Sequence, residues 1–216
     1  MTDWDERFGR GEHVSTQPHA LLERAIEGRS QGRALDLACG AGRHALYLAT
    51  RGWQVVAVDV SRAGIELTRE RAASNGVEID VRHADLACGE FVIEPETYDL
   101  VCDFYYLQRD LFADARRGLR DGGMFVAAIL LAGGDASQAR PVNPTFVLQP
   151  GELHELFKEW KIEHYFEAPE RSDQPGQHSW RTAEIIAVKT KSDERASLFS
   201  NHRPRNRNQN SDSCMT

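Results

Sequence analysis

The sequence predicts an α/β fold, a doubly wound and largely parallel sheet with helices on both faces. Three observations predict it. Short apolar runs alternate with helical segments from about residue 19 to 131, and this order implies βαβ units with right-handed crossovers. The first run ends in a glycine turn, Gly40-Ala41-Gly42, that opens a helix. Two late runs, at about 162–168 and 180–188, follow one another without a helix, which predicts an antiparallel pair at one sheet edge.

The strands are predicted from apolar runs bounded by turn residues. They are expected at about 34–38, 55–58, 78–82, 98–102, 124–131, 162–168 and 180–188. The first two runs are apolar throughout apart from Asp36, so we expect strands buried on both faces. The third run follows the turn signal Asn75-Gly76.

The helices are predicted where apolar residues recur at helical spacing. They are expected at about 19–28, 43–51, 61–74, 107–119 and 151–160. Glycine marks the end of the first helix at Gly28 and of the second at Gly52. The segment Asp121-Gly122-Gly123 is expected to close the fourth.

The chain is expected to have an N-terminal lid segment (1–18), one folded domain (19–190) and a disordered tail (191–216). The lid segment is polar and glycine-rich, and its isolated aromatics Trp4 and Phe8 either close over a bound ligand or pack a short helix. The tail has no apolar periodicity and is rich in Asn, Arg and Ser. Its arginines could contact nucleic acid, but a solvated terminus is the favoured interpretation.

Composition excludes several classes of protein. The 216 residues carry 26 Lys and Arg against 33 Asp and Glu, a net charge of −7, so no general attraction for nucleic acid or an anionic membrane is expected. No apolar run approaches the roughly 18 residues of a membrane span, and the acidic start predicts no secretory signal. Cys39 and Cys102 lie in or beside apolar runs, which suits free thiols in the cytoplasm. No Cys/His spacing predicts a metal site.

The glycine turn lies where the first strand ends and a helix begins, a position at which a backbone can approach a ligand closely. Gly40-x-Gly42-x-x-Ala45 also fits the fingerprint of a nicotinamide dinucleotide site, so the turn alone does not choose the ligand.

Three aspartates indicate a ligand other than a nicotinamide dinucleotide. Asp36, inside the first strand, would repel a pyrophosphate but suits an ammonium group. Asp59 ends the second strand, where a carboxylate can accept hydrogen bonds from both ribose hydroxyls. Asp85 follows the third strand and can accept from the exocyclic amine of adenine. An amine, a ribose and an adenine together describe S-adenosylmethionine. The alternatives are a capping carboxylate for Asp36, a helix cap for Asp59 and a turn residue for Asp85.

The run Leu35-Asp36-Leu37-Ala38-Cys39-Gly40-Ala41-Gly42-Arg43 resembles motif I of the class I S-adenosylmethionine-dependent methyltransferases. The later motifs match in order, and the run Tyr106-Leu107-x-Arg109-x-Leu111-Phe112 is typical of the tellurite-resistance (TehB-like) and thiopurine-like branch. The resemblance covers about residues 3–189 and makes 19–190 a methyltransferase domain. It implies the strand order 3-2-1-4-5-7-6, with strand 7 antiparallel. Ala38 departs from the general pattern, which has glycine there.

The resemblance also implies which residues hold the cofactor: Asp36, Ala38, Gly40, Gly42, Arg43, Asp59, Val60, Asp85, Leu86 and Asp103. Besides the three aspartates discussed above, two of these have open alternatives, since Arg43 could pair with a carboxylate of the protein and Asp103 could solvate a loop. His44 is expected to be a solvent-facing or hydrogen-bonded structural residue.

The acceptor site is expected near His178, Arg181 and Tyr105. His178 could take a proton from the acceptor, Arg181 could hold an anion, and Arg109 is a second candidate. The predicted activity is in-line methyl transfer from S-adenosylmethionine to a small molecule such as a thiol or a chalcogen oxyanion. We expect no nucleic-acid or membrane partner, and a monomer or weak homodimer. A nicotinamide-dependent oxidoreductase and a non-catalytic cofactor-binding module are the alternatives.

Overall fold

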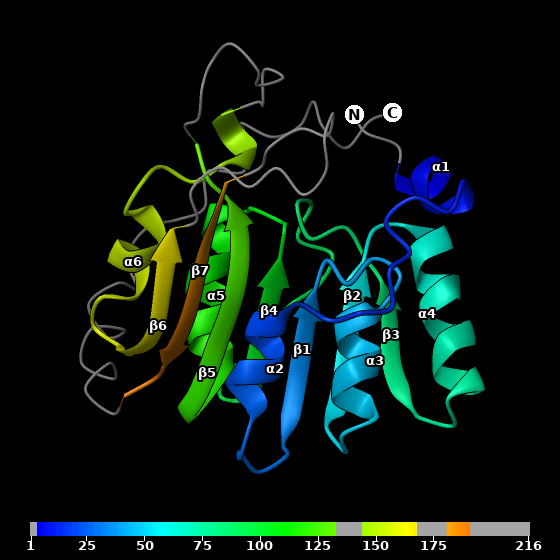
Figure 1. The fold of residues 1–216 in the computed structure, drawn as a ribbon, viewed down its shortest axis with the longest axis horizontal. Helices are drawn as coiled ribbons and strands as arrows, with labels where there is room; N and C mark the ends of the chain where they lie inside the picture. Colours follow the sequence, from blue (N-terminus) through cyan, green and yellow to red (C-terminus); the bar gives the residue numbers. More distant parts are fainter. Residues whose placement is uncertain (1–3, 133–143, 168–180, 191–216) are drawn as a thin grey trace.

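The computed structural model describes residues 4–132, 144–167 and 181–190, in which seven strands form one sheet in the order β3-β2-β1-β4-β5-β7-β6 (Figure 1). The strands are β1 (Arg33–Leu37), β2 (Gln54–Asp59), β3 (Ile79–His83), β4 (Tyr98–Phe104), β5 (Leu119–Leu130), β6 (Lys161–Glu167) and β7 (Thr182–Val188). Strands β1 to β5 pair in parallel, and β7 is antiparallel to both β5 and β6. The predicted fold class and strand order are confirmed.

Helices cover both faces of the sheet (Figure 1). They are α1 (Trp4–Gly9), α2 (Ala20–Ile26), α3 (Arg43–Ala49), α4 (Arg62–Ser74), α5 (Arg109–Gly118) and α6 (Glu152–Phe157), with a 3-10 turn at Pro144–Phe146. Apolar residues of α2, α3 and α4 form one buried cluster with the sheet. Residues of α5 and α6 form a second cluster on the other face, where Phe112, Phe125 and Phe157 pack ring against ring.

Element boundaries differ from the prediction mainly between α5 and β5. The helix ends at Gly118, and the strand begins at Leu119, because Leu119 pairs with Tyr98 of β4. The segment predicted to close the helix is therefore an irregular part of β5. It includes Gly122, whose φ of 77° lies in the left-handed region.

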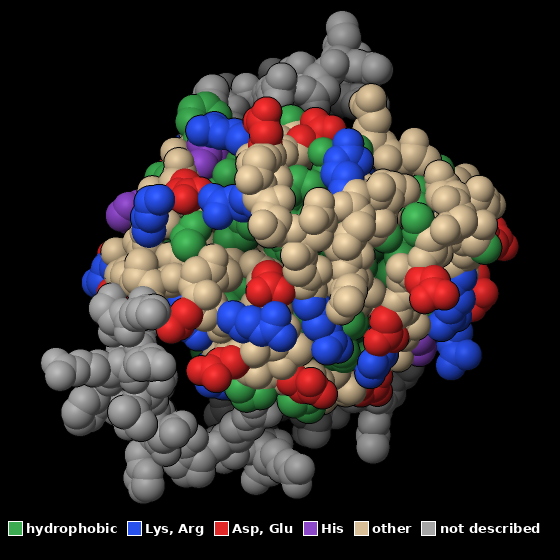
Figure 2. Space-filling view, turned by 90° about the horizontal axis from the view of Figure 1, so that it is seen from below, with side chains coloured by type: hydrophobic (Ala, Val, Ile, Leu, Met, Phe, Trp, Pro, Cys, Tyr) green, Lys and Arg blue, Asp and Glu red, His purple; other side chains and the backbone are tan. Residues whose placement is uncertain are grey.

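The parallel strands end at the top of the sheet in Figure 1. There the strand order reverses between β1 and β4, which are neighbours in the sheet but not in the chain. In doubly wound sheets such a reversal opens a crevice at the carboxyl ends of the strands. Figure 2 shows the molecule from the opposite end, where acidic and basic side chains are interspersed.

Two sequence expectations concern buried and membrane-spanning segments. Cys39 and Cys102 are buried and free, as predicted. Within the described ranges, no helix combines the length and apolarity that a membrane crossing requires. The disordered tail predicted at 191–216 lies outside the described residues.

Candidate cofactor site

The glycine turn packs tightly against α4. Gly40 and Gly42 have φ values of 54° and 74°, in the region that favours glycine. A Cβ on Gly42 would lie 2.5 Å from side-chain atoms of Thr68, and a Cβ on Gly64 would lie 2.9 Å from the Gly40 carbonyl. Thr68 Oγ1 also donates to that carbonyl at 3.1 Å. The turn is therefore fixed by helix packing, and side chains are excluded on both sides of the contact.

Asp36 is buried below the turn and joins three elements. Its Oδ2 accepts from the backbone N–H of Ala45 at 3.0 Å, and its Oδ1 accepts from the Cys102 thiol at 3.3 Å. Gly42 at the N-cap has no side chain to cap α3, so Asp36 performs that role from β1. Burial raises the pKa of Asp36 to about 7, although both hydrogen bonds and the charge of Arg43 act to lower it. The capping alternative is thus present in the structure, and a cofactor contact from Asp36 stays a prediction.

Asp59 ends β2 and holds the turn from the other side. Its Oδ2 accepts from Gly40 N–H at 2.7 Å and its Oδ1 from Ser61 N–H at 2.8 Å. The N-cap of α4 is Ser61, whose hydroxyl accepts from Gly64 N–H, so Asp59 is not itself that cap. Each carboxylate oxygen has a second lone pair, which suits the ribose hydroxyls predicted for it. Val60, the next residue, is an exposed apolar side chain.

Asp85 follows β3 and shapes the next loop. Its Oδ1 accepts from the backbone N–H groups of Ala87 and Cys88 at 2.8 and 3.3 Å. Asp85 therefore has the turn role that was the alternative for it. Neither of these hydrogen bonds uses its Oδ2. Leu86 is buried, and its carbonyl accepts from Gln108 Nε2 at 3.2 Å.

Two buried polar atoms in the described residues have no hydrogen-bond partner, Asp103 Oδ1 and His44 Nε2. Asp103 lies near the end of β4, opposite Leu37 of β1. Burial raises the pKa of its carboxyl well above the usual range, partly countered by the backbone N–H of Tyr106. A carboxylate oxygen buried without a donor is destabilising by itself and well suited to a ligand cation.

His44 differs from the expectation of a solvated or hydrogen-bonded residue. It is 3% exposed, and its ring stacks on Phe104 with centroids 4.0 Å apart. The sequence contained a signal for this burial, since His44 precedes the buried Leu48 by four positions and so shares its helix face.

Tyr105 directly follows β4, and its exposed side chain forms the rim of the site at that strand end. Its φ of 67° is in the left-handed region, which is unusual for a bulky residue and clusters at functional sites. The Arg43 guanidinium lies 5.5 Å from its ring centroid, and the His19 ring lies 6.1 Å away. The structure thus brings together Arg43 and Tyr105, which the sequence had assigned to different ligands.

The other residues predicted to hold the methyl acceptor are His178, Arg181 and Arg109. His178 lies outside the described residues. Arg181 donates to the Ala132 carbonyl at 3.4 Å, and its charge helps lower the pKa of Glu167. Arg109 binds Glu152 with both arms of its guanidinium, at 2.6 and 3.0 Å, so it joins α5 to α6.

Helix α1 covers the glycine turn. Phe8 is buried, and its Cζ lies 2.9 Å from the position that a Cβ on Gly40 would take. Asp5 Oδ1 accepts from Ser61 Oγ at 2.6 Å and from Ala63 N–H at 3.0 Å. Phe8 therefore packs a short helix against the turn, the second of the two alternatives for it.

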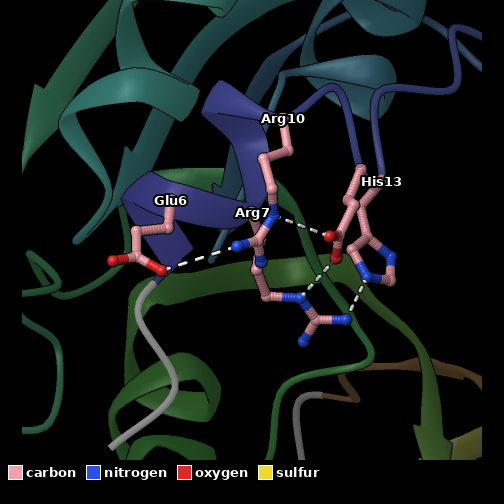
Figure 3. Close-up of polar contacts among 5 residues, drawn as sticks. Glu6, Arg7, Arg10 and His13 are labelled. Atoms are coloured by element: carbon pink, nitrogen blue, oxygen red, sulfur yellow. Dashed lines mark hydrogen bonds and ion pairs between the residues drawn. The ribbon is translucent and has the colours of Figure 1, made fainter.

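Figure 3 shows a charged network that braces this helix and the chain after it. Arg7 donates to Glu12 at 3.1 Å and contacts His13 Nε2 at 2.5 Å, and Arg10 pairs with both Glu6 and Glu12. Arg71 of α4 donates to the carbonyls of Ala41 and Val14, both at 2.6 Å. One side chain thus ties the glycine turn to the segment that follows α1.

The comparisons with known proteins agree with this geometry. A family model described as a methyltransferase domain matches residues 34–123, from β1 to the start of β5. The probable S-adenosyl-L-methionine-dependent methyltransferase TehB of Haemophilus influenzae is 25% identical over 169 residues, 75% of this chain and 57% of the relative. Residues 34–123 are thus a methyltransferase domain, and the chain is similar to the TehB-like class I S-adenosylmethionine-dependent methyltransferases.

The solved structure of Haemophilus influenzae TehB has the same fold, with a TM-score of 0.70 and 21% identity over 87% of this chain and 67% of that one. Ribosomal RNA small subunit methyltransferase C of Alcanivorax borkumensis is 33% identical over 49% of this chain and 35% of its own length. Ribosomal protein L11 methyltransferase of Symbiobacterium thermophilum is 32% identical over 67% and 47%. The chain therefore spans about a third to just over half of the length of the curated relatives, and about two thirds of the TehB chain in the solved structure.

The cofactor of this methyltransferase is S-adenosyl-L-methionine. The residues fit it, because carboxylate oxygens of Asp59, Asp85 and Asp103 lie at or just beyond the ends of β2, β3 and β4, where they can accept hydrogen bonds from a ligand. The nicotinamide alternative is therefore set aside. The contacts of individual residues with the cofactor stay predictions.

Proposed function

We propose that the chain transfers the methyl group of S-adenosylmethionine in line to a small, polarisable acceptor, a thiol, a chalcogen oxyanion or a similar molecule. The observation that carries the proposal is the rim at the end of β4, where the exposed ring of Tyr105 lies beside the Arg43 guanidinium. An aromatic face next to a fixed cation favours a compact anionic or electron-rich acceptor.

In this proposal the chain's residues bind and orient. Asp59 accepts from the ribose hydroxyls, Asp85 from the adenine amine, and Asp103 Oδ1 from the ammonium group. Ala38, Gly40, Gly42, Val60 and Leu86 form the surrounding wall, with Asp36 beneath it. When bound, S-adenosylmethionine supplies a methyl group activated by its sulfonium. Alignment and exclusion of water provide most of the catalysis that such a displacement requires.

Proton transfer has a limited role in this proposal. Burial lowers the pKa of His44 to about 2, so it is a poor base at neutral pH. We assign His178, Arg181 and Tyr105 to the acceptor side, with Arg181 steering an anion. A thiolate or an oxyanion arrives with its lone pair available and suits a site of this kind.

Ribosomal RNA and protein acceptors are the alternative, because two relatives carry such names. The net charge of −7 disfavours RNA. A non-catalytic cofactor-binding module is the second alternative. We further propose a cytoplasmic protein that is a monomer or a weak homodimer, which sedimentation at two concentrations would check.

The test has two stages. Thermal unfolding is measured with S-adenosylmethionine, S-adenosylhomocysteine and NAD, and ligand at about 100 times its dissociation constant should add roughly 2.7 kcal/mol of stability. Formation of S-adenosylhomocysteine is then followed across thiols, selenite, tellurite, small heterocycles, ribosomal RNA and ribosomal protein. Turnover on a small acceptor supports the proposal. Turnover on RNA or protein alone overturns it, and binding without any turnover supports the module.

A further inference from the structure

The unpartnered Nε2 of His44 is a feature that the proposed function does not use. A buried polar atom without a partner destabilises a fold by about 1–3 kcal/mol, and such atoms are rare in native proteins. In the described residues only Asp103 Oδ1 shares this condition. Both atoms belong to residues at the carboxyl ends of β1 and β4 or in the helix that follows them, which is where the cofactor site lies.

The surroundings of His44 define what it can bind. Its ring stacks on Phe104, and Arg43 and His19 lie close enough for their charges to lower its pKa, in addition to burial. The resulting pKa of about 2 makes the imidazole neutral at physiological pH. A neutral imidazole offers one N–H donor and one acceptor, so it can donate a hydrogen bond to an anion without adding a charge.

The two orphaned groups are complementary to an α-amino acid. Asp103 and Phe104 are consecutive in β4, so their side chains leave the strand on opposite faces. His44 packs against Phe104 and Asp103 lies on the other face, so the two orphaned groups flank one strand end. One is a carboxylate whose Oδ1 lacks a donor, and the other is a neutral ring next to Arg43. The amino acid part of a ligand that lies across this strand end could place its ammonium group at Asp103 and its carboxylate at His44.

We propose that His44 is a further cofactor-binding residue, whose Nε2–H donates to the carboxylate of the methionine part of S-adenosylmethionine. This rests on the proposed function, which gives the ammonium to Asp103. The acidic side chains around the crevice, Asp36 and Asp59 among them, would repel that carboxylate, so the donor must come from the α3 side.

The test pairs a ring substitution with a change in the ligand. His44→Phe keeps an aromatic ring to stack on Phe104 but removes both nitrogens. Calorimetry compares binding of S-adenosylhomocysteine with binding of its decarboxylated analogue. The variant is expected to bind S-adenosylhomocysteine at least about tenfold more weakly than wild type, and to bind the analogue with wild-type affinity. His154→Phe, on the distant α6, is the matched control and should change neither affinity.

Two further measurements separate this role from a structural one. His44→Phe is expected to melt no lower than wild type without ligand, since it removes an unsatisfied polar atom. His44→Gln, whose amide can donate from a similar position, should restore part of the discrimination between the two ligands, and it serves if the phenylalanine variant does not fold. Equal weakening of both ligands, or of neither, overturns the proposal. Wild type that binds neither adenosyl ligand overturns the proposed function itself.

Discussion

At the residue scale, the site depends on backbone positions that few residues tolerate. Ala38 has a φ of 51° and Tyr105 a φ of 67°, and both flank the crevice at the ends of β1 and β4. A side chain with a Cβ is strained there by about 1–2 kcal/mol. This explains in physical terms why the position of Ala38 is glycine in the general family pattern.

We expect Ala38→Gly to raise the free energy of unfolding by up to about 1 kcal/mol. Relief of strain exceeds the extra chain entropy that glycine adds to the unfolded state, about 0.4–1 kcal/mol. Urea unfolding without ligand measures it. Ala73→Gly, in the exposed last turn of α4, is the control and should lose stability, by up to about 1 kcal/mol. A similar loss in both variants would contradict the argument.

We expect Asp59→Ala to weaken binding of S-adenosylhomocysteine about tenfold to a hundredfold, because it removes charge-assisted hydrogen bonds. It should also destabilise the fold, since the N–H groups of Gly40 and Ser61 lose their acceptor. Asp59→Asn should be milder, because the amide oxygen still accepts one bond. Calorimetry on folded variants measures the affinity, and unchanged affinity in Asp59→Ala would show that the ribose lies elsewhere.

At the element scale, short helices are held by side chains from distant segments. Helix α3 is capped from β1 by Asp36, and the first turn of α4 receives Asp5 from α1. These bonds fix two helix ends and the glycine turn between them. The position of α1 over the turn is therefore coupled to the position of α4.

We expect Asp5→Ala to lower the free energy of unfolding by about 0.5–2 kcal/mol, the usual effect of losing a helix cap. The hydrogen bonds from Ser61 and Ala63 lower the pKa of Asp5. Its contribution is therefore present at neutral pH and lost as the pH falls through that lowered pKa. Glu66→Ala, which removes an exposed ion pair with Arg69 on the same helix, should lose no more than about 0.5 kcal/mol. Equal effects of the two substitutions would argue against the coupling.

At the scale of the whole molecule, buried carboxyl groups gather near the carboxyl ends of β1, β2 and β4. Burial raises the pKa of Asp36, Asp59 and Asp103. The folded protein without ligand therefore retains protons that the unfolded chain releases. Binding of a cationic cofactor should favour the charged carboxylates and release protons.

We expect Asp36→Asn to change how stability depends on pH. The folded pKa of about 7 lies above the ordinary value of 3.8, so this group makes stability fall as the pH rises from about 4 to about 7, by up to about 1.4 kcal/mol per pH unit. The difference in unfolding free energy between variant and wild type should therefore grow in favour of the variant across that window. Urea titrations at several pH values measure it. A difference that stays constant with pH would contradict the burial of a proton at Asp36.

The sequence by itself determined the order of strands and helices, the antiparallel pair at the edge and the placement of Asp36, Asp59, Asp85 and Asp103 near strand ends. These features follow from local periodicity and from turn chemistry, which are properties of neighbouring residues. The resemblance of motif I and the later motifs added the strand order and the cofactor. The boundary at Leu119 was misplaced because pairing with Tyr98, a contact across the sheet, overrides the local helix signal.

Only the tertiary structure decided which side-chain acceptors and donors are already hydrogen-bonded within the protein. Cys102 bonds Asp36 across 66 positions of the chain, and Phe104 of β4 stacks on His44 of α3. It also decided that Ala38 and Tyr105 take left-handed backbone angles and that Phe8 closes on Gly40. The physical reason is that hydrogen bonding and desolvation depend on every group that packs around an atom, and most of these groups are distant in the sequence.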